Sequence, residues 1–342
     1  PDKGHICCGF YLTGKDYPDK LVLRSGWNPG DFFALVELHP VSVPFNAGGI
    51  MGMNRWGSAF TQVVTSKGST YENRLLVVDV DGKAKLRYHP DPVRLDPDWH
   101  AGKMQDIQSE VTYFEDRADA TFARVRVKNM DGLPVVYERE FVFAKNRFLA
   151  TREIVTFEES FKARVAPLWN TRNVGAQIGS HWANTFMGKL VASNGQVEMN
   201  NPPADLLVWF APREDCRLQV VDRLSEDARA LACPAQVRYL WEGTPSAGET
   251  LVFTQVYYPH APYKPVIKSN HAGAQAVYSN ELQATAGASG IQIVRDDPEA
   301  SVLRLELEPG NVEWVVFNRE KAPIQLGGGV SKDPLDYILE RN

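Results

Sequence analysis

The chain runs Thr-Phe-Ala-Arg-Val-Arg-Val from Thr121 to Val127. Apolar and polar side chains alternate along most of this stretch, as they do in a β-strand with one face against a core. The alternation returns in Leu-Arg-Leu-Glu-Leu-Glu at residues 303–308, and short runs of this kind, separated by turn residues, continue from Leu21 to beyond Phe317. Helical spacing is nearly absent, so the pattern predicts an all-β protein.

The number of strands favours a large sandwich. Typical strand lengths divide the chain into roughly sixteen to twenty strands, more than the seven or so of an immunoglobulin-like domain. No repeat of fixed period is visible, which disfavours a propeller. We therefore predict a single domain over residues 1–342, built as a two-sheet antiparallel β-super-sandwich with few or no helices. One short helix is expected at residues 334–340.

Composition and charge argue against several classes of protein. The chain has 44% hydrophobic residues, enough for a core, and a formal net charge of −5 without a basic block, which disfavours nucleic-acid binding. No apolar run reaches the roughly 18 residues of a membrane-spanning helix, so no membrane span is predicted. The sequence opens at Pro1 without a methionine or an apolar leader, and we expect it to be processed or part of a longer protein.

Four cysteines leave the redox state open. Cys7 and Cys8 are adjacent, whereas Cys216 and Cys233 flank a segment that could form a hairpin and could pair across it. Four free or buried thiols are the alternative. No Cys-x-x-Cys motif is present, so a cysteine-bound zinc is not predicted.

Five segments of the chain resemble, in order, a known domain. They are LVLRSGW at 21–27, FFALVEL at 32–38, NAGGI at 46–50, TYENRLLVVD at 70–79 and YEREFVF at 137–143. Together they are similar to the C-terminal β-sandwich of the heparinase II/III-like polysaccharide lyases. The resemblance implies β-elimination on an acidic, uronate-containing glycan and a secreted or periplasmic location. It also implies a helical toroid domain ahead of the sandwich, which supplies a catalytic tyrosine.

The chain departs from this family at the metal-binding positions. The family carries a His-x-His cluster in the loop after the second of these strands, where this chain has the single histidine His39. Glu72 stands where the family has a later metal-binding histidine. His39 and Glu72 are therefore the candidate ligands if a divalent metal is bound, although the motifs do not support such a site.

Residue types suited to β-elimination occur in the loops near these segments. A lyase removes the C5 proton of a uronate and neutralises its carboxylate, for which His, Tyr, Asn or Arg are suited. His39, at the end of a predicted strand, is the candidate base, and Tyr71 is the candidate proton donor. The residues predicted to neutralise the carboxylate are Asn46, Asn54 and Arg55.

Aromatic and polar side chains in irregular segments suit sugar binding. Tryptophan rings offer apolar faces, and Arg and His offer hydrogen bonds. The candidates are Trp56, Trp99 in a long loop, Trp169, Arg172 and His181. Each of the candidate residues also has a purely structural explanation, as a strand end, a turn or a core side chain.

Two other functions remain open. The domain could be a non-catalytic module that binds glycan through Trp56 and Trp169, or that scaffolds the helical domain. It could also be a glycoside hydrolase whose two acids are distant in sequence. Glu158 and Glu159 are adjacent, so in a strand they would face opposite sides and would not form such a pair.

Overall fold

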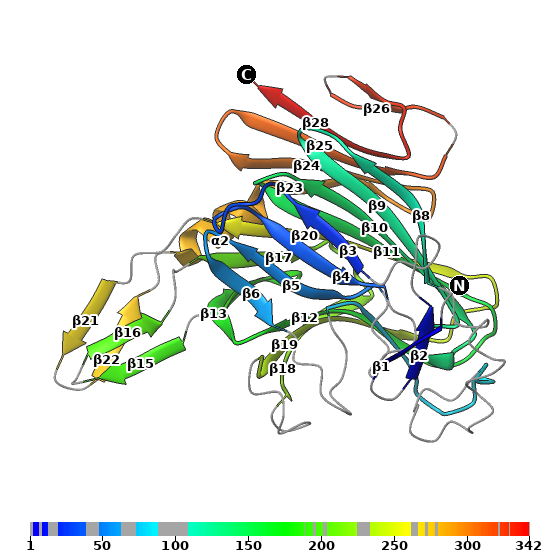
Figure 1. Ribbon diagram of the computed structural model, residues 1–342, viewed down its shortest axis with the longest axis horizontal. Coiled ribbons are helices and arrows are strands. Elements are labelled where there is room, and N and C mark those ends of the chain that lie inside the picture. The colour runs from blue at the N-terminus through cyan, green and yellow to red at the C-terminus, as the bar shows by residue number, and fades with distance from the viewer. Residues whose placement is uncertain are drawn as a thin grey trace.

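The computed structural model describes residues 3–6, 9–12, 20–38, 48–62, 73–87, 109–187, 189–193, 196–200, 204–223, 233–260, 266–270, 273–277, 280–320, 322–327 and 329–341. The fold is all-β and antiparallel, as predicted (Figure 1). Within these ranges the only α-helix is α2 (Asn280–Ser289), and no helix is long and apolar enough to cross a membrane.

An eight-stranded sheet forms the centre of the molecule. Side chains alternate between its two faces, and both faces are apolar: in β10, Tyr137 and Phe141 enter one core, while Val142 and Ala144 enter another. A sheet of this kind has to be covered on both sides. Its strands, in spatial order, are β13 (Asn173–Ile178), β14 (Trp182–Phe186), β17 (Asp205–Phe210), β20 (Thr250–His260), β11 (Phe148–Phe157), β10 (Val135–Ala144), β9 (Ala120–Lys128) and β8 (Ser109–Asp116).

Two four-stranded sheets cover the first face. One has the order β3 (Lys20–Arg24), β4 (Phe33–Glu37), β5 (Ile50–Arg55) and β6 (Ser58–Gln62). The other has the order β18 (Cys216–Asp222), β19 (Ala235–Gly243), β12 (Ala163–Thr171) and β7 (Leu75–Asp79). Phe32, Phe60, Leu75 and Trp169 from these sheets pack on the central sheet in one continuous core.

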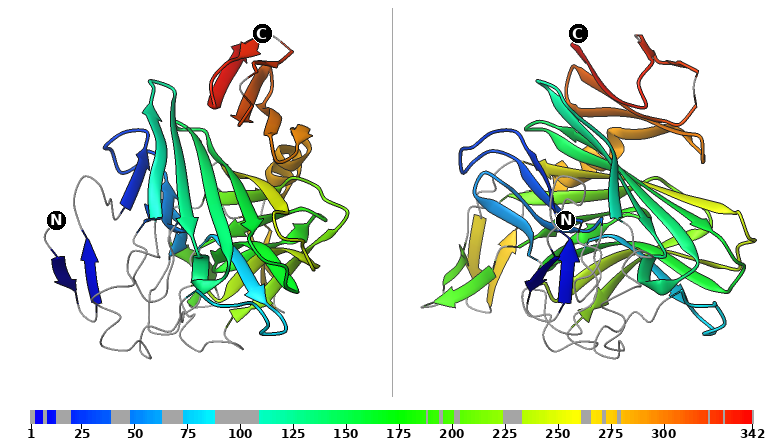
Figure 2. Two further views of the ribbon diagram at one scale, coloured as in Figure 1. Left: turned by 90° about the vertical axis from the view of Figure 1, so that its right-hand side faces the viewer. Right: turned by 45° about the vertical axis from the view of Figure 1, so that its right-hand side comes forward.

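A further four-stranded sheet and α2 cover the second face (Figure 2). This outer sheet has the order β23 (Ile291–Asp296), β24 (Ala300–Glu308), β25 (Asn311–Asn318) and β28 (Leu335–Arg341). Phe317 and Tyr337 from it meet Phe122 and Trp209 of the central sheet. The sandwich therefore has three layers, with the central sheet between two cores.

Eight further strands form two-stranded hairpins at the periphery. They are β1 (Lys3–Ile6) with β2 (Gly9–Leu12), β15 (Lys189–Ser193) with β16 (Gln196–Asn200), β21 (Val266–Asn270) with β22 (Gly273–Val277), and β26 (Ile324–Gln325) with β27 (Val330–Ser331).

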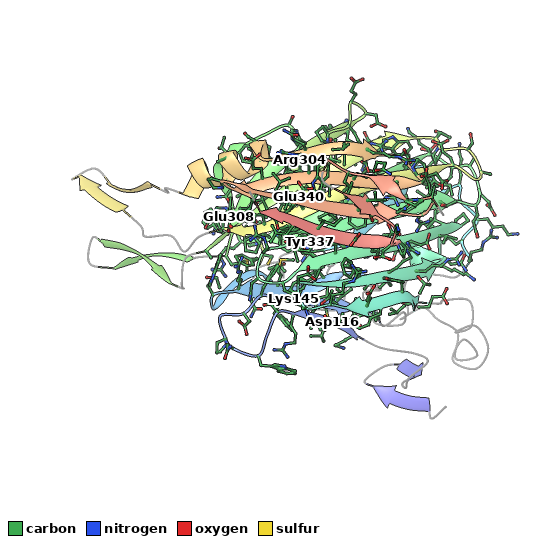
Figure 3. The ribbon with its side chains drawn as sticks, turned by 90° about the horizontal axis from the view of Figure 1, so that it is seen from above. Asp116, Lys145, Arg304, Glu308, Tyr337 and Glu340 are labelled. Carbon is green, nitrogen blue, oxygen red and sulfur yellow. The ribbon has the colours of Figure 1, made fainter. Side chains whose placement is uncertain are left out.

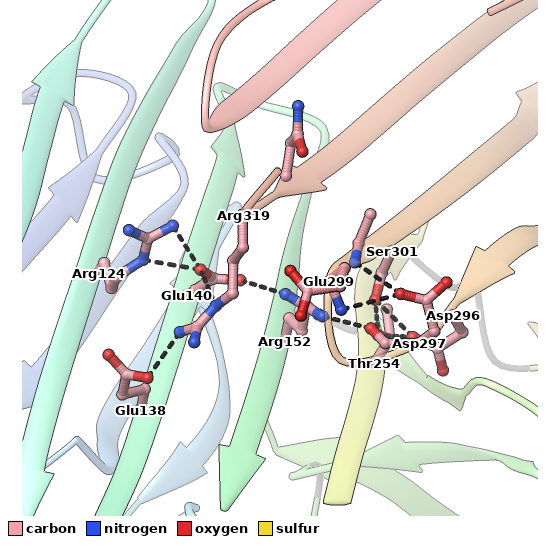
Figure 4. A network of polar contacts seen from close by, with 12 residues as sticks. Arg124, Glu138, Glu140, Arg152, Thr254, Asp296, Asp297, Glu299, Ser301 and Arg319 are labelled. Carbon is pink, nitrogen blue, oxygen red and sulfur yellow. Dashed lines mark hydrogen bonds and ion pairs between the residues drawn. The ribbon is translucent and has the colours of Figure 1, made fainter. Parts of the chain in front are cut away.

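A network of charged side chains joins the central sheet to the outer sheet (Figure 4). The buried carboxylate of Glu140 accepts hydrogen bonds from Arg124 at 2.7 Å, Arg152 at 3.2 Å and Arg319 at 3.4 Å. Arg319 also binds Glu138 at 2.8 Å. The three arginines surround the Glu140 carboxylate, and Arg319 also binds Glu138. No charge of this network is therefore buried without an opposite charge beside it.

Three local expectations were wrong. The helix expected at 334–340 is absent, and residues 335–341 form strand β28, because Leu335 and Tyr337 alternate into the core while β28 pairs with β25. The prolines and aromatic residues of the stretch 257–270 predict a loop, yet the stretch contains the end of β20 and the whole of β21. Helix α2 was not anticipated, since its sequence NELQATAGAS has little apolar periodicity.

Cys216 and Cys233 do not pair. Cys233 is buried with its Sγ 3.8 Å from Met187 Sδ, and Cys216 lies beside Asp215. Burial raises the pKa of the Cys216 thiol to about 12, so it is not a reactive thiolate. Cys7 and Cys8 lie outside the described residues.

Arg117 links the β8–β9 hairpin to the segment before β28. It contacts Glu115 at 2.8 Å, Asp333 at 2.9 Å and Asp336 at 3.0 Å. Hydrogen bonds from Arg117 and Tyr113 lower the pKa of Glu115 from 4.5 to about 2. A depressed carboxyl pKa contributes stability above the unfolded pKa, and that contribution disappears as the pH falls from about 4.5 toward 2.

We expect Arg117→Gln to lower the free energy of unfolding at pH 7 by about 1 kcal/mol, since the contacts are partly exposed. The difference from wild type should shrink at pH 3, where Glu115 in the unfolded chain is protonated. Urea unfolding of wild type and Arg117→Gln at pH 7 and pH 3 measures this difference in the free energy of unfolding. A difference that is equal at pH 7 and pH 3 would show that these ion pairs do not contribute.

Candidate functional site

The predicted site residues are attached to two opposite ends of strand β5. Strands β4 and β5 run antiparallel, with Val36 opposite Ile50 and Phe33 opposite Asn54. The end of β5 at Ile50 therefore lies near the end of β4 that leads to His39. The other end carries Arg55. At a rise of about 3.3 Å per residue, the two ends are about 17 Å apart.

At the Ile50 end, three chain segments that carry predicted residues converge. His39, Asn46, Tyr71 and Glu72 lie outside the described residues. The positions that adjoin them are bonded to one another: Glu37 N–H donates to Gly49 O at 2.8 Å, Gly48 N–H donates to Glu37 O at 2.7 Å, and Ile50 N–H donates to Asn73 O at 3.0 Å. The chain thus brings the attachment points of all four predicted residues together.

The side chain of Arg139, on strand β10 of the central sheet, binds two of the residues that meet here. Its Nη1 donates to the carbonyl oxygens of Gly48 at 2.9 Å and Asn73 at 2.6 Å. Its Nη2 forms an ion pair with Glu153 at 3.0 Å and a hydrogen bond to the Tyr257 hydroxyl at 3.3 Å. We call Gly48, Asn73, Arg139 and Glu153 the loop-base cluster.

The side chain of Asn73 extends this anchoring to the neighbouring sheets. Its Nδ2 donates to Ile50 O at 2.9 Å and to Thr61 Oγ1 at 3.0 Å, and its Oδ1 accepts from the Asn170 backbone N–H. Gly48 has φ +84°, and a Cβ there would lie 2.9 Å from the Tyr137 ring, so glycine is required at this point.

The loop-base cluster is buried and has no direct access to a ligand. Arg139 and Glu153 have no exposed surface. Burial raises the pKa of Glu153, and the charge of Arg139 opposes the shift. Burial likewise raises the pKa of the Tyr137 and Tyr257 hydroxyls above its usual value, so both stay protonated. These residues can position the loops but cannot take part in chemistry at the surface.

At the Arg55 end lies a groove that crosses the end of β20. A first hollow of about 220 Å³ is lined by Arg55, Trp56, Asn146, Arg147, Tyr258, Pro259, His260, Leu307 and Glu308. Beyond Tyr258, His260 and Leu307 it continues into a second hollow of about 540 Å³, whose lining includes Gly287, Ser289, Gln292, Arg304 and Glu306. We call both together the β20-end groove. Figure 3 shows Glu308 at the end of the outer sheet near α2.

A tight turn presents Arg55 and Trp56 to this groove. Trp56 has φ +54° and Gly57 has φ +74°, the pattern of a type I′ hairpin turn between β5 and β6. The Arg55 guanidinium carbon lies 3.9 Å from the centre of the indole ring. Burial, together with the nearby charge of Arg147, lowers the pKa of Arg55 to about 10. Asn54 lies just before this turn, and its Oδ1 is buried without a hydrogen-bond partner among the described residues.

His260, to which the sequence analysis gave no role, is part of a buried polar chain at the groove. Its Nε2 lies 2.9 Å from Asn184 Oδ1, and Asn184 Nδ2 donates to Asp205 at 2.8 Å. Because Asn184 turns its amide nitrogen to Asp205, its Oδ1 is the acceptor and His260 Nε2 carries the hydrogen. In the neutral ring, Nδ1 then has the lone pair. Tyr258, also missed, adjoins Arg55, and burial raises its pKa.

Sequence reasoning missed Tyr258, His260, Arg147 and Glu308 because they come from three separate hairpins or strand ends. The one available signal was the aromatic and histidine-containing end of the strand Tyr257-Tyr258-Pro259-His260.

Three further predicted binding residues do not line the groove as described: Trp169, Arg172 and His181. Trp169 has no exposed surface and packs against Tyr257 with ring centres 4.8 Å apart, so it is a core residue that offers no face to a sugar. Arg172 and His181 are half-buried near β14 and the edge strand β13, and His181 lies edge-on to Trp209. Burial lowers the pKa of His181. Trp99 lies outside the described residues.

No metal site is visible among the residues that the structure describes: no three His, Cys, Asp or Glu side chains are grouped to hold an ion. The candidate ligands His39 and Glu72 are not among those residues.

Comparisons with known proteins show the fold. No protein-family model and no curated protein matches the sequence. The crystal structure of heparinase III superposes with a TM-score of 0.51 at 12% identity, over 89% of this chain and 42% of that one. A mutant of the heparan sulfate lyase HepC from Pedobacter heparinus gives 0.49 at 10% identity, over 95% and 42%. A second heparinase III, the BT4657 gene product, gives 0.47 at 9% identity, over 100% and 43%.

The chain thus spans less than half the length of these structures. At 12% identity the likeness to heparinase III concerns the fold alone. The resemblance predicted from the five sequence segments is confirmed at that level.

Proposed function

We propose that this chain is the β-sandwich part of a polysaccharide lyase that acts on a uronate-containing glycan by β-elimination. The observation that carries the proposal is the loop-base cluster, where the attachment points of His39, Asn46 and Tyr71 are bonded together over Arg139. The shared fold with heparinase III supports it. In such a protein a helical domain would complete the site, and the glycan would be met in a secreted or periplasmic location.

In the proposed reaction, His39 takes the C5 proton of the uronate. The electrons of the C5–H bond form the C4–C5 double bond, the C4–O4 bond breaks, and Tyr71 gives a proton to the departing oxygen. Asn46 donates a hydrogen bond to the carboxylate, whose charge rises as C5 loses its proton. The carboxylate is bonded to C5, so the group that neutralises it has to reach the same sugar as the base.

Arg55 and Asn54 are not assigned to this uronate in the proposal. They are attached at the end of β5 about 17 Å from the end that adjoins the segment leading to His39. The proposal therefore keeps His39, Asn46 and Tyr71 for the elimination and treats Arg55 and Asn54 separately.

The test is incubation of the chain with a panel of uronate-containing glycans, sulfated and unsulfated. Ultraviolet absorbance reports the conjugated double bond, and a reducing-end assay counts the cleaved bonds. We expect both signals to rise together on at least one glycan. Reducing ends without absorbance would instead indicate a glycoside hydrolase. Binding seen by calorimetry without either product would indicate a non-catalytic module.

A further inference from the structure

We infer that the β20-end groove is a second binding site, separate from the loop-base cluster, for the anionic group of an acidic sugar, with Arg55 as the residue that binds the anion. The glycan class follows from the proposed function, but binding in the groove does not require elimination. The inference rests on the environment of Arg55, the fixed position of its side chain and the lining of the groove.

Arg55 is a half-buried cation without a direct ion pair among the described residues, and only the longer-range charge of Glu308, in the same hollow, attracts it. Its Nη1 donates to Arg147 O at 3.3 Å, while its Nε is buried without a hydrogen-bond partner, and no carboxylate lies within 4.0 Å of it in the part of the chain that the structure describes. Buried charges in proteins are normally paired, since removing an isolated ion from water is costly. An anion in the groove would supply the missing partner.

The neighbouring arginine shows the contrast. Arg147 lines the same hollow, but its guanidinium binds Glu313 at 2.8 Å and also contacts Glu308 at 3.4 Å. Glu308, a carboxylate of this hollow, also accepts a hydrogen bond from Asn311 at 3.1 Å. Arg147 and Glu308 therefore form ion pairs within the protein, whereas Arg55 forms none in the described part of the chain and can offer its guanidinium to a ligand.

The turn fixes Arg55 in this position. Trp56 occupies the left-handed backbone conformation that a type I′ turn requires, which is unfavourable for a residue with a side chain. Its backbone N–H is bonded to Gly30 O at 2.9 Å, and its ring lies against the guanidinium. Trp56 therefore orients Arg55, and the face of its ring that meets the guanidinium is not available for a sugar.

The rest of the groove suits a sugar. The second hollow, about 540 Å³, is within the range of small-molecule sites. Its lining combines the hydrogen-bonding side chains of Gln292, Ser289 and Tyr258 with the ion pair of Arg304 and Glu306, which are 3.1 Å apart. Alternating donors and acceptors of this kind match the hydroxyl groups of a glycan, and Arg55, the arginine of the groove without a direct ion pair, matches one carboxylate or one sulfate.

The test is calorimetric titration of the wild-type chain, Arg55→Gln and Trp56→Ala with three oligosaccharides of equal length. One carries uronate carboxylates only, one is sulfated with its carboxyl groups reduced, and one is neutral. Arg217→Gln is the matched control, because Arg217 is an exposed arginine on β18 that is paired with Glu242. Thermal melting verifies that each variant is folded.

We expect Arg55→Gln to raise the Kd of an acidic oligosaccharide about 10- to 100-fold, because the variant loses a charged hydrogen bond to the anion. Trp56→Ala should weaken binding in the same direction, and Arg217→Gln should not change it. Loss confined to the first oligosaccharide would assign a carboxylate, and loss confined to the second would assign a sulfate. Equal affinity of Arg55→Gln and wild type, or no binding of either acidic oligosaccharide by wild type, would overturn the inference.

Discussion

Arg139→Met is expected to lower the free energy of unfolding by about 3–5 kcal/mol, because it leaves the Glu153 carboxylate buried without its partner. Denaturant unfolding at pH 7 measures this. The loss should be smaller at pH 4. Without Arg139, the pKa of Glu153 in the folded protein is raised further. A carboxyl group whose pKa is higher in the folded than in the unfolded chain destabilises the fold as the pH rises above its pKa in the unfolded chain, so the variant should lose less stability at pH 4 than at pH 7.

The double variant Arg139→Met/Glu153→Leu separates the effect of the buried charges on stability from the role of Arg139 in positioning the loops. It removes both charges, so most of the stability should return, as it does when other buried ion pairs are replaced by apolar residues. The carbonyl oxygens of Gly48 and Asn73 still lack the donors that Arg139 provides. If the proposed function holds, kcat for elimination should therefore stay reduced while the fold is stable. A stable double variant with full kcat would show that Arg139 does not position the loops.

The strands could be predicted from the sequence because each carries its own signal. The alternation of apolar and polar residues in β9 and β24 is visible residue by residue. The turn at Asn129-Met130-Asp131-Gly132 marks the end of β9 and precedes β10. The layering could not be predicted. Arg139, Glu140, Arg152 and Glu153 appear in the sequence as charged positions that would face solvent, yet all are buried.

Their burial depends on partners that are remote in sequence. Arg139 stands directly opposite Glu153 across the β10–β11 pair, and Arg319 reaches Glu138 and Glu140 from the outer sheet. Sequence periodicity cannot show which charges will meet in this way. The same limit applies to β28, whose pairing with β25 decides its conformation.

The candidate site was predictable in residue type but not in position. The sequence places His39 and Arg55 within one glycine-rich stretch, which suggests that they are neighbours. The length of β5, about 17 Å, instead lies between Arg55 and the end of β4 that leads to His39. Tyr258 and His260 reach the groove with Arg55 because β20 lies beside β11, whose hairpin carries Arg147. That proximity is a property of the sheet order.

His39→Ala is expected to lower kcat for elimination by about 10²- to 10⁴-fold, the usual contribution of a general base. The rate is followed by the absorbance of the unsaturated product. The histidine control is His271→Ala, since no role is assigned to His271. The affinity for the glycan should change little, because the contribution of a base arises mainly in the transition state.

Two further readouts distinguish a base from a structural histidine. Added imidazole should partly restore the rate of His39→Ala, since a small base can enter the space that the side chain leaves. Restoration should grow with the fraction of neutral imidazole as the pH rises. An unchanged rate in His39→Ala would remove His39 as the base. A lost rate that imidazole does not restore, in a variant with wild-type stability, would instead make His39 a residue that shapes the loop beyond Leu38.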